Sequence, residues 1–219
     1  MSDIRVDGYK SISFWQEDNI GLVVLRPDDS SNLEISHISE LVTAIGTAAM
    51  DDGVKAVAIT GLNMRYGTGF NFGDRRSTEN LMEYCGALLS LVYSIEKPIF
   101  TIVNGNAIDI GYEIALLGDV VISSNAIEVG FSSSYTFMLG GSITSSRMKN
   151  PGRGRAVSGV NVDIAYNPEN LLDDAKRYIT DHFLFDYPLV RRRRMISFRE
   201  SLLEEREHFF KRRGTQIPG

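Results

Sequence analysis

The sequence predicts an α/β protein in which strands and helices alternate along the chain. Three apolar runs at 20–25, 54–60 and 99–103 are rich in β-branched residues, which is typical of strands buried on both faces. Two segments at 36–52 and 77–95 have apolar residues at helical spacing. Parallel strands joined by right-handed helical crossovers therefore form the expected core.

The first 60 residues predict a hairpin, a helix and a strand. Ser11–Gln16 and Ile20–Leu25 flank a short polar turn and so favour two antiparallel strands. Ser36 is the expected N-cap of the first helix, which should end near Asp52. The buried strand 54–60 follows directly after Gly53.

A glycine-rich loop at 61–74 separates this strand from the second helix. The loop lacks the Gly-Lys-Ser/Thr ending of a phosphate-binding P-loop, so phosphate binding is not its expected role. The helix at 77–95 should end before Pro98, because a proline disfavours helical geometry in the residue that precedes it.

The stretch 97–123 predicts a strand, a turn at Asn104-Gly105, an apolar helix and a further strand at 120–122. Glu113 lies on this helix among apolar neighbours. A buried carboxylate either pairs with an arginine or backbone N–H groups, or takes part in chemistry, because an unpaired buried charge is costly. Asp109 is either the N-cap of the helix or a second acid near the same place.

The C-terminal part predicts two helices, one starting at Pro168 and one at about 188–213. They follow a Gly- and Arg-containing connection at 150–159. We therefore divide the chain into an α/β core at 1–150 and a helical, oligomer-forming region at 151–219.

Composition argues against several classes of function. The net charge of −5 argues against nucleic-acid binding, and four successive arginines at 191–194 point all round a helix rather than forming one basic stripe. The lack of a long apolar run and of a leader pattern predicts a cytoplasmic protein without a membrane partner. The single cysteine, Cys85, excludes an internal disulfide and a multi-cysteine metal site, and no metal is expected.

Four segments together resemble the crotonase (enoyl-CoA hydratase/isomerase) superfamily over roughly residues 11–130. They read IGLVVLRPDDSSNLEISHISELVTAI, DDGVKAVAITG, MRYGTGFNF and IEKPIFTIVNGNAIDIGYEIALLGDVVIS. The resemblance implies a crotonase-like spiral of ββα and βαβ units with a C-terminal helical region. It also implies a homotrimer or dimer of trimers that acts on acyl-CoA thioesters, with coenzyme A as part of the substrate and no separate cofactor.

Members of the superfamily stabilise an oxyanion with two backbone N–H groups, and such preorganised donors lower a barrier by several kcal/mol. The matching loop is Tyr66–Asn71, which puts the first donor on Phe70. The second donor is the middle residue of a glycine triplet, and here that residue is Ile110. Glu113 matches the first of the two glutamates of hydratases, whereas Ser133 stands at the second.

The resemblance also suggests contacts to coenzyme A from Thr68 and Asn71 of the same loop and from Lys211 and Arg212 near the C-terminus. A single carboxylate is easier to reconcile with isomerisation or decarboxylation than with hydration, which needs one group for water and another for the proton. The remaining alternative is a non-catalytic member that binds acyl-CoA or serves as a subunit of an oligomer.

Overall fold

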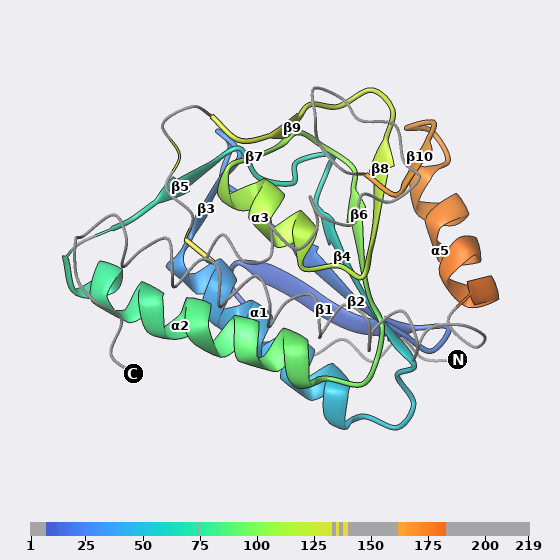
Figure 1. The fold of residues 1–219 in the computed structure, drawn as a ribbon, viewed down its shortest axis with the longest axis horizontal. Coiled ribbons are helices and arrows are strands. Elements are labelled where there is room, and N and C mark those ends of the chain that lie inside the picture. The colour runs from blue at the N-terminus through green and yellow to red at the C-terminus, as the bar shows by residue number, and fades with distance from the viewer. Residues whose placement is uncertain (1–7, 74, 133–134, 136–137, 140–161, 183–219) are drawn as a thin grey trace, which may run out of the picture.

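The structure is a computed structural model that describes residues 8–73, 75–132, 135, 138–139 and 162–182. Its centre is a six-stranded sheet with the order β1-β2-β4-β6-β8-β10 (Figure 1). The strands are β1 (Ile12–Glu17), β2 (Ile20–Leu25), β4 (Ala56–Gly61), β6 (Ile99–Val103), β8 (Val120–Ser124) and β10 (Ile164–Tyr166).

Only the first two strands of this sheet are antiparallel, and the other pairs are parallel. All residues of β2, β4 and β6 are buried, because helices cover the sheet on both faces. This explains why the apolar runs are continuous rather than alternating. The α/β prediction and the hairpin are therefore confirmed.

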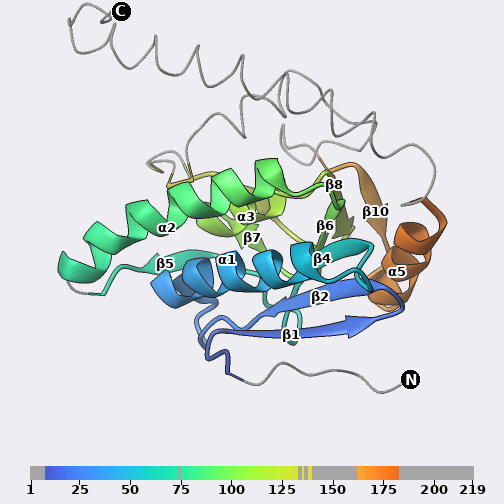
Figure 2. The same ribbon diagram turned by 90° about the horizontal axis from the view of Figure 1, so that it is seen from below.

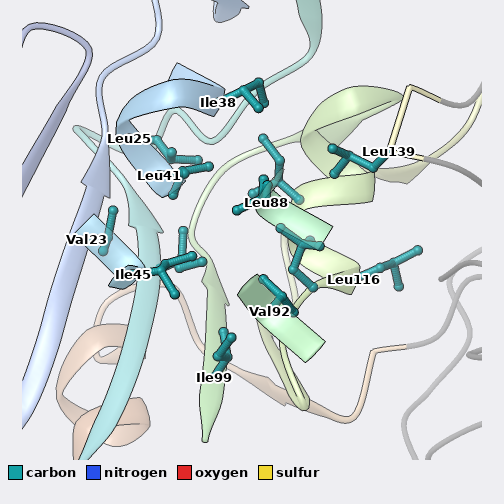
Figure 3. Packing of buried hydrophobic residues seen from close by; sticks show 14 of the residues in the cluster. Val23, Leu25, Ile38, Leu41, Ile45, Leu88, Val92, Ile99, Leu116 and Leu139 are labelled. Atoms are coloured by element: carbon teal, nitrogen blue, oxygen red, sulfur yellow. The ribbon is translucent and has the colours of Figure 1, made fainter. Parts of the chain in front are cut away.

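Helices α1 (Ile35–Met50) and α2 (Arg75–Ser94) run side by side along one face of the sheet (Figures 1 and 2). The main core lies between them and the sheet, where Leu41, Leu88 and Val23 are almost fully buried (Figure 3). Helix α5 (Leu171–His182) covers the other face and packs Ala175 and Ile179 against a second cluster.

Two short parallel strand pairs stand outside the large sheet. Strand β3 (Asn32–Glu34) pairs with β5 (Gly69–Asn71), and β7 (Ala107–Ile108) pairs with β9 (Val129–Gly130). The short helix α3 (Ile110–Leu116) follows β7 and contacts both β5 and β7 (Figure 1). These pairs therefore bring the glycine-rich loop to the start of α3.

The start of α1 differs from the prediction. The helix begins at Ile35 with Glu34 as the N-cap, not Ser36. The backbone N–H of Glu34 donates to Nδ1 of His37 at 3.0 Å, and the hydroxyl of Ser36 instead donates to Glu34 Oε1 at 2.7 Å. In the usual capping box a Glu or Gln three residues after the N-cap accepts from the N-cap backbone N–H. Here the side chain of His37 is that acceptor.

The expected helix at 188–213 and the proposed boundary at residue 150 lie outside the described residues, so the division into two regions stays a prediction. Strand β10 was not expected, and it extends the sheet beyond β8. Within the described part of the chain, no helix combines the length and the apolar character needed to cross a membrane.

Candidate active site

The glycine-rich loop and helix α3 meet backbone to backbone at Gly67 and Gly111. A Cβ atom on Gly111 would lie 2.7 Å from the carbonyl carbon of Gly67 and closer still to its oxygen. Hydrogen bonds fix the loop at this point, since Gly67 N donates to Asn106 O at 3.2 Å and Gly67 O accepts from Ile108 N at 2.9 Å. Only a residue without a side chain allows this approach.

Phe70 lies three residues after Gly67, in the middle of β5 and opposite Leu33 of β3. Its side chain is half-buried and contacts Phe72 edge to face, with ring centroids 5.1 Å apart. The backbone N–H of Thr68 donates to Ser31 O at 2.8 Å. The loop is therefore anchored both to β3 and to the start of α3.

Ile110 is the first residue of α3. The first N–H groups of a helix have no partner within the helix, so the backbone donor of Ile110 is not used by α3 itself. The isoleucine side chain is only 1% exposed and belongs to the main core. The core thus accommodates the isoleucine side chain at the start of α3.

Glu113 is buried one turn further along α3, with 2% of its surface exposed. Its Oε2 atom accepts three hydrogen bonds, from the Tyr135 hydroxyl at 2.7 Å and from the backbone N–H groups of Met138 and Leu139 at 2.9 and 3.0 Å. These donors supply hydrogen bonds that a buried carboxylate needs. Backbone N–H groups are one of the two kinds of structural partner that the sequence predicts for Glu113.

The rings of Tyr112, Phe131 and Tyr135 pack one against the next, and Tyr135 contacts the Glu113 carboxylate. Tyr112 packs against Phe131 at 4.9 Å, and Phe131 stacks on Tyr135 at 5.6 Å. Burial and the charge of Glu113 raise the pKa of Tyr135, so the hydroxyl stays protonated and donates to Glu113. Burial, and to a lesser extent Glu113, raises the pKa of Cys85 to about 12, which makes this thiol a poor nucleophile.

Asp109 occupies the N-cap position of α3, as expected, but its side chain does not cap the helix. The Oδ1 atom accepts from Ser132 N at 2.7 Å, and Oδ2 accepts from the Ser132 hydroxyl at 2.9 Å. The backbone has φ 56° and ψ −115°, a conformation that glycine, asparagine and aspartate adopt most readily. For a residue with a Cβ this conformation costs about 1–3 kcal/mol.

The coenzyme A contacts expected from Thr68, Asn71, Lys211 and Arg212 stay predictions. The amide of Asn71 donates to Asp28 Oδ2 at 3.0 Å, which ties β5 to the loop before β3. Ser133, Lys211 and Arg212 lie outside the described residues. In the described segments, no group of three or more His, Cys, Asp and Glu side chains is arranged to hold a metal ion.

Sequence reasoning missed two features of this site. Tyr135 is a direct partner of Glu113, but no pattern in the sequence connects these two residues. Gly67 was not singled out, although its backbone contact with Gly111 brings the loop and the helix together. The Gly-Thr-Gly pattern at 67–69 was the available signal, because closely spaced glycines mark sites of close backbone approach.

The sequence profile of the family described as Enoyl-CoA hydratase/isomerase matches residues 16–150, which is more than half of the chain. The chain belongs to this family. The crotonase resemblance noted from the four sequence segments is thereby confirmed.

Curated relatives include an enoyl-CoA hydratase of Alternaria alternata, 25% identical over 135 residues, which cover 59% of this chain and 44% of the relative. A probable mitochondrial enoyl-CoA hydratase of Dictyostelium discoideum is 30% identical over 115 residues, which cover 51% of this chain and 42% of the relative. The matched part thus spans less than half the length of these relatives.

Solved structures confirm the crotonase fold. An enoyl-CoA hydratase from Mycobacterium avium subsp. paratuberculosis aligns with a TM-score of 0.72 at 17% identity, covering 92% of this chain and 90% of that one. A second enoyl-CoA hydratase structure, from Geobacillus kaustophilus, has a TM-score of 0.74 at 14% identity, covering 95% and 91% of the two chains. At these identities the likeness concerns the fold.

Proposed function

We propose that the protein binds an acyl-CoA thioester and stabilises its enolate with the backbone N–H groups of Phe70 and Ile110. Glu113 is the single carboxylate of the reaction. The observation that carries the proposal is the backbone contact of Gly67 with Gly111, which holds the loop of Phe70 against the start of α3. Two backbone donors from separate segments are what an oxyanion hole needs.

The proposed step moves one proton and no other atom. The Glu113 carboxylate takes the proton from the carbon next to the thioester carbonyl, and the electron pair of that C–H bond passes to the thioester oxygen. The two N–H groups stabilise this negative charge while it exists. Glu113 then returns the proton to a carbon further along the acyl chain, which shifts a double bond and restores the carboxylate.

Isomerisation of this kind fits a single carboxylate better than hydration does. Hydration requires one group to activate water and another to deliver a proton, and a serine hydroxyl at position 133 is a poor substitute for either. Decarboxylation of a malonyl-type thioester is the related alternative, because carbon dioxide leaves with no proton transfer before the enolate forms.

A second candidate is a non-catalytic family member that binds acyl-CoA or serves as an oligomer subunit. The observation that favours it is the set of three hydrogen bonds to Glu113 Oε2 from Tyr135, Met138 and Leu139. These bonds would give the carboxylate a purely structural purpose, that of holding the segment after β9 against α3.

The test is a panel of 2-enoyl-, 3-enoyl- and malonyl-CoA, with product followed by mass spectrometry for the wild type and Glu113→Gln. Glutamine keeps an oxygen that can accept the bonds from Tyr135, Met138 and Leu139 but cannot act as a base at neutral pH. Tyr135→Phe is the comparison variant: it removes one donor to Glu113 and leaves the carboxylate in place, so it measures the part of the loss that is due to orientation alone.

We expect the wild type to convert 3-enoyl-CoA to 2-enoyl-CoA, and Glu113→Gln to lose this activity by about 100-fold or more. Turnover that is unchanged in Glu113→Gln would remove Glu113 from the mechanism. Binding of all three thioesters without any turnover would support the non-catalytic candidate.

We also propose a homotrimer or dimer of trimers on the strength of the family resemblance, and a location in the cytoplasm on the strength of the sequence pattern. Sedimentation equilibrium at several concentrations measures the assembly directly. Fluorescence microscopy of a tagged full-length protein tests the location.

A further inference from the structure

Strands β7 and β9 form a regular parallel ladder up to the start of α3. Ala107 N donates to Glu128 O at 2.9 Å, and Asp109 N donates to Gly130 O at 2.9 Å. In a parallel ladder a residue donates its N–H to a carbonyl of the partner strand. Its own C=O accepts from the N–H of the partner residue two positions after that carbonyl. The next bond would therefore run from Ser132 N to the carbonyl of Asp109.

The carbonyl of Asp109 is not used in this way. It accepts instead from Glu113 N at 2.9 Å and so forms the first hydrogen bond of α3. The Asp109 carboxylate takes over the missing acceptor, because its Oδ1 atom accepts from Ser132 N at 2.7 Å. The side chain thus continues the ladder by one bond at the point where the backbone turns into the helix.

This extra bond acts on the segment that reaches Glu113. Phe131 lies next to Ser132 and packs between Tyr112 and Tyr135, with a ring angle of 10° to the latter. Tyr135 then donates to Glu113 at 2.7 Å. Direct contacts therefore connect Ser132 at the end of the ladder with the Glu113 carboxylate through Phe131 and Tyr135.

We propose that Asp109 is a positioning residue that holds the segment after β9 in register and so keeps Tyr135 against Glu113. Both of its carboxylate oxygens are bonded to Ser132, which sets this role apart from that of a replacement acid. Its consequence for turnover rests on the proposed function, whereas its effect on the segment does not.

The test compares Asp109→Gly, Asp109→Asn and Ser132→Ala by amide hydrogen exchange resolved to single residues. Glycine suits the backbone angles of Asp109 but removes the carboxylate. Asparagine keeps both contacts, since its oxygen can accept from Ser132 N and its amide can donate to the hydroxyl. Ser132→Ala removes only the contact to Oδ2.

We expect Asp109→Gly to raise exchange at Ser132 and Leu139 by about tenfold, the effect of losing one hydrogen bond, and Asp109→Asn to restore wild-type exchange. The amide of Ile99, bonded to Asp119 Oδ2 at 2.8 Å in the sheet, serves as an internal control and should not change. Unchanged exchange at Ser132 in Asp109→Gly would overturn the proposed ladder bond. A change at Ser132 without a change at Leu139 would overturn its transmission to Glu113.

Kinetics with the 3-enoyl thioester add a second measurement. We expect Asp109→Gly to lower kcat with little change in KM, because the orientation of Glu113 is disturbed while the coenzyme A contacts stay, and Asp109→Asn to recover kcat. A KM increase at constant kcat would overturn the positioning role. If the wild type turns over no thioester, the proposed function fails, and the exchange data still decide the role of Asp109 in the fold.

Discussion

Gly111→Ala is the substitution that tests the geometry of the site most severely. The added Cβ would lie 2.7 Å from the carbonyl carbon and 3.1 Å from the Cα of Gly67, and closer still to the carbonyl oxygen. These are backbone atoms of a loop tied to Asn106 and Ile108 by hydrogen bonds, so they cannot rotate away as a flexible side chain would. The loop and α3 must therefore separate.

The size of the effect follows from two opposing terms. Alanine in place of glycine within a helix stabilises by about 0.5–1 kcal/mol. Overpacking against rigid atoms costs about 1–3 kcal/mol and sometimes more. Because the clash is with backbone, we take the upper end, which leaves a net loss of about 2 kcal/mol and a Tm lower by roughly 4–8 °C for a chain of this size.

Gly86→Ala is the matched control. Gly86 also lies within a helix, α2, but a Cβ there would meet nothing within 4 Å. We expect this variant to gain about 0.5–1 kcal/mol in urea denaturation, in contrast to Gly111→Ala. Equal stability of the two variants would refute the close approach of Gly67 and Gly111.

Three further predictions concern buried titratable groups. Burial lowers the pKa of His37, so at mildly acidic pH the unfolded chain binds a proton at this residue and the folded chain does not. The free energy of unfolding should therefore fall as the pH drops below about 6.5, the ordinary pKa of histidine. Urea titrations at pH 5.5 and 7.5 measure this dependence, and His37→Asn should flatten it. The Tyr66 hydroxyl is buried and has no hydrogen-bond partner among the residues that the structure describes. Tyr66→Phe should therefore raise the free energy of unfolding by about 1 kcal/mol, and a loss of stability would reveal a partner. With a thiol pKa of about 12, Cys85 should resist iodoacetamide at pH 8 in the native protein and react once the protein is unfolded; rapid native labelling would contradict its burial.

The inner strands β2, β4 and β6 of the large sheet could be predicted from the sequence because they are continuous apolar runs, whereas the edge strand β10 could not. Strands β2, β4 and β6 are buried on both faces, and this leaves a strong signal in composition alone. The pairs β3–β5 and β7–β9 left no such signal, since they have two or three residues per strand and form only when distant loops meet. Two or three residues are too few to show an alternation of apolar and polar residues.

The candidate site could be predicted only in part for a similar reason. Glu113 stood out because a carboxylate among apolar residues is unusual. Its partner Tyr135 is 22 residues away, in a segment without helical or strand periodicity, so its contact with Glu113 depends on tertiary structure. The N-cap position of Asp109 was predicted, but its bonds to Ser132 depend on the register of β7 and β9.

If the backbone N–H groups of Phe70 and Ile110 form the proposed oxyanion hole, they polarise the carbonyl of a bound thioester. The most direct measurement is the infrared stretching frequency of a carbon-13-labelled carbonyl in a saturated short-chain acyl-CoA bound to the protein. We predict a lower frequency than in water for the wild type and for Glu113→Gln, because the backbone donors are unchanged, and a smaller shift for Gly111→Ala. A bound thioester with the same frequency as in water would show that no such pair of donors reaches the carbonyl.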